Sequence, residues 1–372
     1  MQAQNNDKES VKELWAYAFD EQEPFLSEFF DNFWKAEDAL VIKEDSKLAG
    51  ALLMIPYCVS LNSSPVMSAY IVGVSVASEF RGRKFSKKLM RECLIEQKNR
   101  NMALSLLIPF NYEFYNKLGY RMCYTLDIYE LTQDNLPYIE DISPVKRVQV
   151  CDYKKLNSVY NDFCRDKNGY IIRTKDDWEY IFFEQKLSGG GIFAVENDNS
   201  FSGYASFSEK NGEIFVRELV YKDNNSLLSL LSEFKKYKKI KIRTVSDKLL
   251  LKQILNPKNV LKTIPTVMAR VTDIEKVLSL YDISDLKIKI KDDLIEENCG
   301  TYEKIDNKIL KTNNKSFDVC LDIGSFTELA LGFSSADELL FSNRLSADEK
   351  TIEKLIKIFP KQNNYINHIM EE

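Results

Sequence analysis

Histidine is nearly absent from this sequence, and other scarce features also narrow its possible functions. The 372 residues include one histidine, His368. A multi-histidine metal site is therefore excluded, as is a catalytic triad with an internal histidine base, and we expect no metal cofactor. The seven cysteines are dispersed with no CxxC pair, which favours a reducing cytoplasm over a disulfide framework. With only 13 glycines and 9 prolines, the composition is that of a folded protein.

Long apolar runs are also missing. Residues 48–78 carry no charge, but Pro56 and the stretch NSSP at 62–65 interrupt them. The remaining apolar pieces are shorter than the roughly 20 residues that a membrane helix needs, so we expect buried strands and no membrane span. The polar start MQAQNNDKES predicts no signal peptide, and the expected location is the cytoplasm.

The length of the chain predicts two or three domains, and its patterns divide it into three α/β or α+β parts. Residues 1–145 are expected to hold two helices, a hairpin, a strand, an amphipathic helix at 84–98, a strand at 103–109, a short helix and a last strand at 121–131. Residues 146–265 repeat this order at an offset of about 150 residues. Residues 266–372 begin with a strand running into a helix and continue with short strands and further helices.

The segment VSVASEFRGRKFSKKLM at 74–90 concentrates positive charge in a chain whose net charge is -5. Five of the eight residues from Arg81 to Lys88, here called the basic segment, are cationic. A glycine-bearing turn at a helix N-terminus exposes backbone N–H groups and attracts anions such as a diphosphate. The other interpretation is a solvated face of a surface helix. The second part has KDNNS at the corresponding place, with no basic turn, which favours a functional role for the first.

The basic segment resembles the acetyl-CoA signature of the GNAT acetyltransferases, R/Q-x-x-G-x-G/A. Arg81 matches its first position, whereas Lys84 stands where glycine is usual and Ser86 where glycine or alanine is usual. Downstream, FNYEFYNKLGY resembles the family's F-Y-x-x-x-G-[FY] helix and places Tyr115 at the position of the catalytic tyrosine. For an isolated tyrosine, packing within an aromatic helix is the alternative.

The order of the three parts resembles the Eis (enhanced intracellular survival) acetyltransferases over essentially the whole chain. The third part, with VMARVTDIEKVL and DIGSFTELALGFSSADEL, resembles the sterol carrier protein-like domain of that family. The resemblance implies a GNAT domain at 1–145, a second GNAT-like domain without a cofactor loop at 146–265, and a sterol carrier protein-like domain at 266–372. It also implies a homo-oligomer, often a hexamer.

The same resemblance implies acetyl transfer from acetyl-CoA to a primary amine of a cationic small molecule, similar to an aminoglycoside or polyamine, or of lysine. Tyr115 would act as the general acid, and a carboxylate at the end of the chain, Glu372 or alternatively Glu371, as the base. The implied acetyl-CoA site consists of Val74, Ser75, Val76, Arg81, Gly82, Arg83, Lys84, Phe85, Ser86, Lys87, Phe110 and Asn111.

Several alternatives stay open at this point. The aromatic stretch FFDNFWK, with Phe30, Asp31, Phe33 and Trp34, either lines an acceptor pocket or, as its helical spacing favours, buries its aromatic rings in a core. The whole chain is alternatively a non-catalytic ligand or lipid carrier, or an assembly protein, on a decayed GNAT scaffold. Nucleic-acid binding is not expected, because EFKKYKKIKIR is the only other basic run and reads as a helix end entering a strand.

Overall fold

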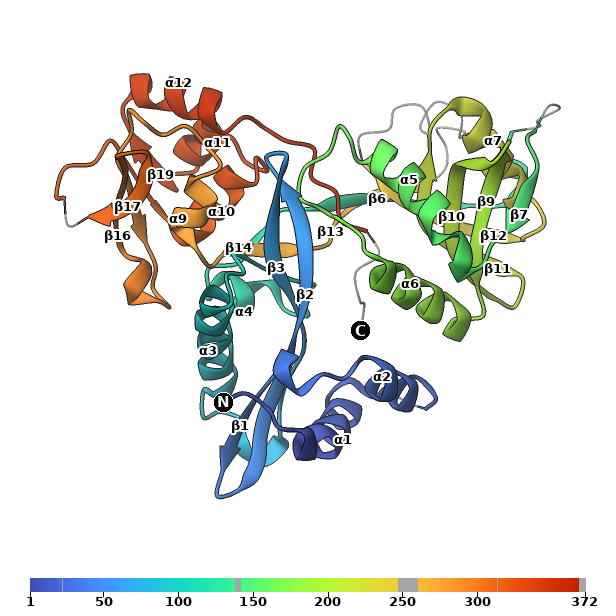
Figure 1. Cartoon of the computed structure of the whole chain (residues 1–372), viewed down its shortest axis with the longest axis horizontal. Helices are drawn as coiled ribbons and strands as arrows, with labels where there is room; N and C mark the ends of the chain where they lie inside the picture. The colour runs from blue at the N-terminus through green and yellow to red at the C-terminus, as the bar shows by residue number, and fades with distance from the viewer. Residues whose placement is uncertain (22, 138–141, 247–259, 313, 368–372) are drawn as a thin grey trace. The chain divides into compact units, whose positions relative to one another are not determined.

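The computed structural model describes residues 1–21, 23–137, 142–246, 260–312 and 314–367 (Figure 1). These residues form two compact units. Unit 1 holds residues 1–123 and 267–362, and unit 2 holds residues 124–266 and the end of the described chain from residue 363. None of the helices within the described ranges combines the length and the apolar character needed to cross a membrane.

The first sheet of unit 1 has the strand order β1-β2-β3-β4-β14-β5. Strands β1 to β3 are antiparallel neighbours, β4 runs parallel to β3, and β14 runs antiparallel to both β4 and β5. The bounds are β1 (Ala39–Glu44), β2 (Lys47–Leu61), β3 (Ser64–Val76), β4 (Leu104–Leu107), β5 (Arg121–Met122) and β14 (Met268–Val271).

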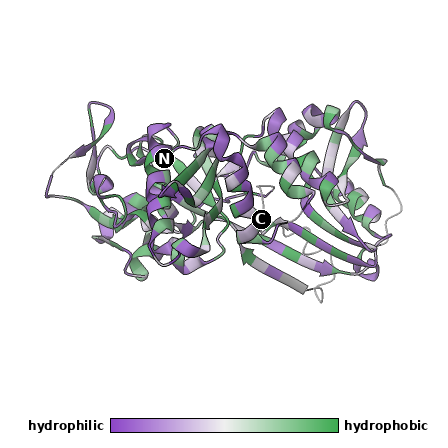
Figure 2. Ribbon diagram, turned by 90° about the horizontal axis from the view of Figure 1, so that it is seen from below, coloured by the Kyte–Doolittle hydropathy of each residue, from purple (hydrophilic) through white to green (hydrophobic). Residues whose placement is uncertain are grey.

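Four helices accompany this sheet: α1 (Lys8–Phe19), α2 (Phe25–Phe33), α3 (Phe85–Asn99) and α4 (Tyr112–Asn116). Figure 1 shows α3 on one side of the β2–β3 pair and α1 with α2 on the other. One stripe of α3 is buried against the sheet because its apolar residues recur at helical spacing, as the sequence predicted: Leu89, Met90, Cys93 and Leu94. Figure 2 shows the same alternation of hydrophobic and hydrophilic residues along the helices.

Residues 267–362, most of the third part of the chain, belong to unit 1 and carry a 5-stranded sheet of order β17-β16-β15-β18-β19. Its elements are α9 (Ile274–Leu278), β15 (Ile288–Lys291), β16 (Gly300–Ile305), β17 (Lys308–Thr312), β18 (Val319–Asp322), α10 (Ile323–Ala330), α11 (Ala336–Phe341), β19 (Leu345–Ala347) and α12 (Glu349–Ile358). Asp322 ends β18 and caps α10 by accepting a hydrogen bond from Ser325 N–H, 2.9 Å away.

Unit 2 is built on a 7-stranded sheet of order β13-β6-β12-β11-β10-β9-β7. Its elements are β6 (Thr125–Leu131), β7 (Val145–Arg147), α5 (Tyr153–Phe163), β8 (Tyr170–Ile171), α6 (Lys175–Leu187), β9 (Gly191–Asn197), β10 (Ser200–Lys210), β11 (Glu213–Tyr221), α7 (Asn224–Phe234), β12 (Lys239–Val245) and β13 (Val260–Pro265).

The internal repeat predicted from the sequence is visible in the strand pairing. In unit 2 the antiparallel strands β9, β10 and β11 are followed by helix α7 and by β12, which is parallel to β11. In unit 1 the antiparallel strands β1, β2 and β3 are followed by α3 and by β4, which is parallel to β3. The predicted mixed α/β class is thereby confirmed.

One predicted element is wrong in its extent. The last strand expected at 121–131 is two strands, β5 and β6, which belong to different sheets. The chain leaves the first sheet at Cys123, whose N–H donates to Val267 O at 3.2 Å. Strand β14, which the sequence places at the start of the third part, fills the position beside β4 instead. The edge of β4 is thus completed by a strand that follows it by about 160 residues, a long-range pairing that local patterns do not encode.

Candidate active site

The first feature of the site is the separation of β3 from β4. Their parallel pairing covers only Ser68–Tyr70 with Leu104–Leu106. Strand β3 continues to Val76 and stays paired with β2 on its other edge, where Ser75 faces Ala51. Among the described residues, the edge of β3 toward β4 therefore has no β-strand partner near Val74 to Val76. This edge offers backbone groups to a ligand.

Gly73 marks the point where β3 changes its course. Its φ of +67° is in the left-handed region, and a Cβ there would lie 2.5 Å from the ring of Trp15 on α1. A side chain at this position would collide with the indole, which is almost completely buried. Glycine thus allows α1 to pack directly on the strand beside the opening.

The second feature is the turn that leads from β3 into α3. Gly82 has a φ of +79°, and no atom lies within 4 Å of the position where its Cβ would be. Lys84, the N-cap residue of α3, has φ 62° and ψ 19°. This is the left-handed conformation that glycine adopts most easily. The position where the GNAT signature carries glycine therefore has the backbone of a glycine position although it holds a lysine.

The N-terminus of α3 is open to an anion. The side chain of its N-cap residue, Lys84, makes no capping hydrogen bond, and the first backbone bond of the helix runs from Lys88 N–H to Lys84 O at 3.1 Å. The N–H groups of the first turn, including those of Phe85 and Ser86, are thus left for another acceptor. The ring of Phe85 packs toward the hydrophobic core, at 6.0 Å from the ring of Phe80, so this residue faces the turn with its backbone only.

The cations of the basic segment fall into two groups. Arg81 donates from Nε to Val76 O at 3.4 Å, and its guanidinium lies 5.7 Å from the ring centre of Tyr17. Arg83 pairs with Glu44 at 2.7 Å. For Lys84, Lys87 and Lys88, no ion pair with another residue of the described ranges is found, and all three are exposed. Three ammonium groups at an uncapped helix N-terminus therefore carry uncompensated positive charge.

The third feature is helix α4, which carries Tyr115. Asn111 is its N-cap and accepts a hydrogen bond from Phe114 N–H at 2.9 Å. The ring of Tyr115 is 3% exposed and makes edge contacts with Phe110, Phe114 and Tyr120 at centroid distances of 5.5, 5.0 and 5.9 Å. Phe110 itself is 70% exposed. Of the three rings that contact the buried tyrosine, that of Phe110 is therefore the exposed one.

The aromatic stretch at 25–34 forms a core, as its spacing favoured. Phe29 and Phe30 are buried and pack around Trp15, and Trp34 stacks on Phe30 at 5.6 Å. Asp31 points away toward Lys8, 2.8 Å distant, and this hydrogen bond and charge lower the pKa of Asp31. An acceptor pocket built from these side chains gains no support from this packing.

His368, Glu371 and Glu372 lie outside the described residues. Within the described ranges no group of three or more His, Cys, Asp or Glu side chains is placed to hold a metal ion.

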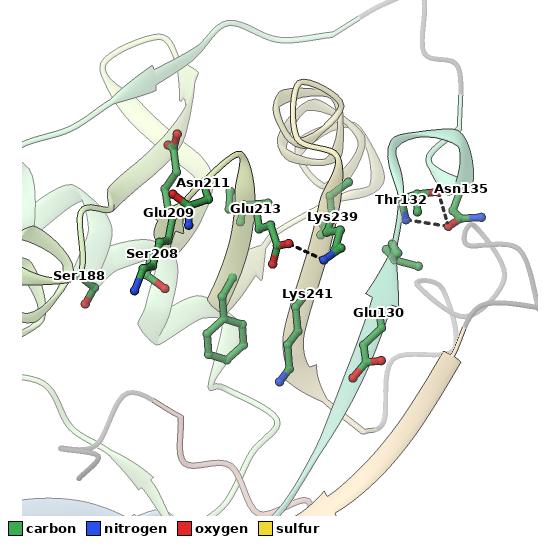
Figure 3. Close-up of a pocket in the computed structure, with 15 residues that line it drawn as sticks. Glu130, Thr132, Asn135, Ser188, Ser208, Glu209, Asn211, Glu213, Lys239 and Lys241 are labelled. Carbon is green, nitrogen blue, oxygen red and sulfur yellow. Dashed lines mark hydrogen bonds and ion pairs between the residues drawn. The ribbon is translucent and has the colours of Figure 1, made fainter. Parts of the chain in front are cut away.

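A cavity of about 830 Å³ lies elsewhere, in unit 2. Figure 3 shows that it is lined by neighbouring strands of the second sheet, with the ion pair between Glu213 and Lys239 in its wall. Its charged side chains are of both signs: Glu130, Glu209, Glu213, Lys210, Lys239 and Lys241. It contains none of the residues predicted for catalysis or acetyl-CoA binding. The residues predicted to hold the diphosphate, Arg81 to Lys87, lie instead at the turn that leads into α3.

The sequence predicted the basic segment and Tyr115 as site residues, but it did not predict the side chains that contact the two arginines of the basic segment. Tyr17 beside Arg81 and Glu44 beside Arg83 come from distant elements, and nothing in the local sequence marks them.

Comparisons with known proteins agree with this geometry. The family model described as an acetyltransferase (GNAT) domain matches residues 1–123, and that of a sterol carrier protein domain matches residues 274–367. No protein with a curated description matches the chain.

Solved structures match over nearly the whole length. A GCN5-related N-acetyltransferase from Anabaena variabilis is 19% identical with a TM-score of 0.85, covering 98% of this chain and 97% of that one. A probable N-acyltransferase from Enterococcus faecalis is 20% identical with a TM-score of 0.85, covering 97% of each. Eis1 from Mycobacterium abscessus is 14% identical with a TM-score of 0.79, covering 99% of this chain and 98% of that one. The chain thus joins an N-terminal GNAT acetyltransferase domain, at residues 1–123, to a C-terminal sterol carrier protein domain, at residues 274–367.

Proposed function

We propose that this protein transfers the acetyl group of acetyl-CoA to a primary amine of a cationic small molecule, similar to an aminoglycoside or polyamine, or of lysine. The observation that carries the proposal is the N-terminus of α3, at the point where β3 and β4 separate. Its side-chain cap is missing, and its three exposed lysines have no ion pair within the described part of the chain. Such a site suits the diphosphate of coenzyme A, because anions bind where backbone N–H groups and positive charge converge.

In this proposal the backbone from Arg81 to Lys87 holds the diphosphate, and the pantetheine arm follows the opening between the strands. Phe110 and Asn111 line the arm near its thiol end. Backbone N–H groups in the stretch from Val74 through Ser75 to Val76 donate to the thioester carbonyl oxygen. Fixed donors stabilise the negative charge that develops on that oxygen during attack.

The reaction follows from these positions. The amine nitrogen attacks the carbonyl carbon, the carbon–sulfur bond breaks, and the thiolate of coenzyme A leaves. Tyr115 gives its phenolic proton to the thiolate, since an ordinary phenol with a pKa near 10 stays protonated at neutral pH. A carboxylate, proposed to be that of Glu372, takes the proton that the amine loses. The protonated carboxyl group then releases its proton to water, and water returns one to Tyr115, which restores both groups.

The proposal also includes an oligomeric state and a cellular compartment. A homo-oligomer, with six copies as the size implied by the resemblance to Eis proteins, is part of the proposal and is measured by light scattering. The seven cysteines are dispersed along the sequence with no CxxC pair, which supports a reducing compartment such as the cytoplasm.

The proposal is tested by release of free thiol from acetyl-CoA with a panel of amines, together with calorimetric titration of acetyl-CoA. We expect binding, and thiol release that depends on the amine. Lys87→Ala should weaken acetyl-CoA binding by about tenfold, because an ammonium–phosphate interaction contributes about 1.5 kcal/mol.

Lys350→Ala is the matched control for this measurement. Lys350 is also an exposed lysine in the first turn of a helix, but Asp348 caps that helix by accepting from Thr351 N–H at 2.7 Å. This variant should bind acetyl-CoA like the wild type. Absence of binding to the wild type would reject the proposed enzyme and leave the carrier alternative.

A further inference from the structure

The segment that follows Tyr115 is held by two guanidinium groups. Arg270 of β14 donates from Nη1 to Leu118 O at 2.5 Å. Arg121 donates from Nη1 to Asn116 O at 3.0 Å and to Tyr120 O at 2.9 Å. Three alternate carbonyls, that of the last residue of α4 and two in the turn that follows it, are therefore bound by arginine side chains.

Each arginine is paired with an aspartate of residues 274–362, the region of unit 1 that matches the sterol carrier protein domain and is here called the sterol carrier part. Nη2 of Arg270 lies 2.5 Å from Oδ2 of Asp292, and both side chains are completely buried. Nη2 of Arg121 lies 3.4 Å from Oδ1 of Asp322, which is partly exposed. The two Arg–Asp pairs thus connect the sterol carrier part to the carbonyls behind the tyrosine.

Asp292 is itself firmly held. It accepts hydrogen bonds from Leu294 N–H at 3.0 Å, from Ile295 N–H at 3.1 Å and from Asn298 Nδ2 at 2.9 Å. Burial acts to raise its pKa, but the charge of Arg270 and these hydrogen bonds outweigh burial and lower it. The carboxylate is therefore ionised and fixed in place at neutral pH.

Two glycines leave room for the two guanidinium groups. A Cβ at Gly119, whose φ is +82°, would lie 1.8 Å from Nη1 of Arg270. A Cβ at Gly324, at the start of α10, would lie 2.5 Å from Cζ of Arg121. Both arginines pack directly on backbone at these points, so the segment and the sterol carrier part fit each other closely.

The held segment is tied to the backbone of Tyr115. Leu118 N–H and Tyr120 N–H both donate to Tyr115 O, at 3.0 and 3.1 Å. Helix α4 has only five residues, too few to be stable on its own. The position of Tyr115 therefore depends on what binds the turn that follows it.

We infer that the sterol carrier part positions the acid of the acetyl transfer: through Asp292–Arg270 and Asp322–Arg121 it fixes the carbonyls after Tyr115 and so aims the tyrosine at the leaving thiolate. Arg270, Arg121 and the two aspartates are positioning residues, and none contacts the reacting atoms. The inference rests on the proposed acetyl transfer. It gives the sterol carrier part a task within the reaction, separate from binding a ligand of its own.

The main test uses Asp322→Asn, which keeps an N-cap for α10 because asparagine caps as well as aspartate, but removes the charge facing Arg121. We expect kcat to fall about five- to tenfold, because small displacements of a catalytic group lower the rate. The KM for acetyl-CoA should not change, since the basic segment is untouched. Asp322→Glu should restore part of the loss.

Two further measurements separate positioning from general damage. In a Tyr115→Phe background, Asp322→Asn should cause no further loss of kcat, since the group that it positions is already gone. Hydrogen exchange of a peptide covering residues 112–121 should become faster in Asp322→Asn. Arg270→Lys keeps a positive charge for Asp292 but cannot bind Leu118 O at the same time. This variant should also lower kcat and speed up hydrogen exchange of the same peptide.

Asp282→Asn is the matched control. Asp282 is an exposed carboxylate of the same part of the chain and pairs with Lys304 at 3.1 Å. Both kcat and exchange at residues 112–121 should stay at wild-type values in this variant.

The possible outcomes are distinct. If the wild type transfers acetyl groups but Asp322→Asn and Arg270→Lys leave kcat unchanged, or if the loss in Asp322→Asn adds fully to that in Tyr115→Phe, the inference is wrong. If the wild type shows no acetyl transfer, the proposed function is wrong. In that case hydrogen exchange alone tests the connection to Tyr115, and unchanged exchange in both Asp322→Asn and Arg270→Lys would reject it.

Discussion

Replacing Lys84 with glycine and with alanine separates the two properties of this residue, its charge and its backbone conformation. Lys84 has φ 62° and ψ 19° at the N-cap of α3. Both variants remove the ammonium group next to the expected diphosphate. Only glycine also removes the conformational cost of holding a Cβ in the left-handed region.

The magnitudes follow from the backbone. The left-handed conformation costs a residue with a Cβ about 1–2 kcal/mol, and glycine removes this cost. Glycine also makes the unfolded chain more flexible, which offsets about 0.5–1 kcal/mol of the gain in stability. Lys84→Gly should therefore raise the free energy of unfolding by about 0.5–1 kcal/mol. Lys84→Ala keeps the cost and should stay within about 0.5 kcal/mol of the wild type.

Binding of acetyl-CoA should respond to charge alone. Each variant loses one ammonium group, so the dissociation constant should rise about tenfold in both. Urea denaturation measures the free energy of unfolding, and calorimetry at fixed salt measures the dissociation constant of acetyl-CoA. Equal stability of the two variants would contradict the left-handed conformation of Lys84, and unchanged affinity in both would remove Lys84 from the diphosphate site.

Three further predictions concern the rest of the molecule. Tyr115→Phe should lower kcat by at least about tenfold, because a general acid contributes about 10²–10⁴-fold; Tyr112→Phe on the same helix is the control, and equal rates in the two variants would argue against an acid at Tyr115. Glu218→Gln should lower the free energy of unfolding by about 3–5 kcal/mol, because it leaves the buried charge of Arg173 without a partner charge. Glu213→Gln, the control, should lower it by less than about 1 kcal/mol, because the pair of Glu213 with Lys239 is exposed. Similar losses of stability in the two variants would contradict this prediction. The pKa of Asp292 is lowered in the folded state, so its contribution to stability is present above the unfolded pKa of about 3.9 and is lost as the pH falls through the folded value. Asp292→Asn should therefore be less stable at pH 7 and lose less stability on acidification, and urea denaturation at pH 7 and at acidic pH checks both statements.

Residues close in the sequence made the ligand side of the site predictable. A strand, a basic turn with glycine and an amphipathic helix are all encoded within residues 74–90, and the structure has them there. The short helix with Tyr115 was also predictable, because its N-cap Asn111 and the glycine after it are local signals. The conformation of Lys84 was not, since lysine seldom occurs at a positive φ.

Contacts between distant residues could not be predicted. Arg270 lies in the stretch MARV, which reads as an ordinary strand, and its charge is buried only because Asp292 and Leu118 O meet it there. Strand β14 itself belongs to the first sheet by pairing with β4, although the sequence places it with the third part. In unit 2, Tyr365 donates to Glu218 at 2.6 Å across 147 residues, again without any local signal.

The most direct measurement is a crystal structure of the protein with acetyl-CoA. We predict the diphosphate within hydrogen-bond distance, about 3 Å, of the backbone N–H groups of the α3 N-terminus, beside Gly82 and Lys84, with the thioester sulfur next to the hydroxyl of Tyr115. Acetyl-CoA bound elsewhere, for example in the cavity of unit 2, or a basic segment without ligand at saturating acetyl-CoA, would contradict this prediction.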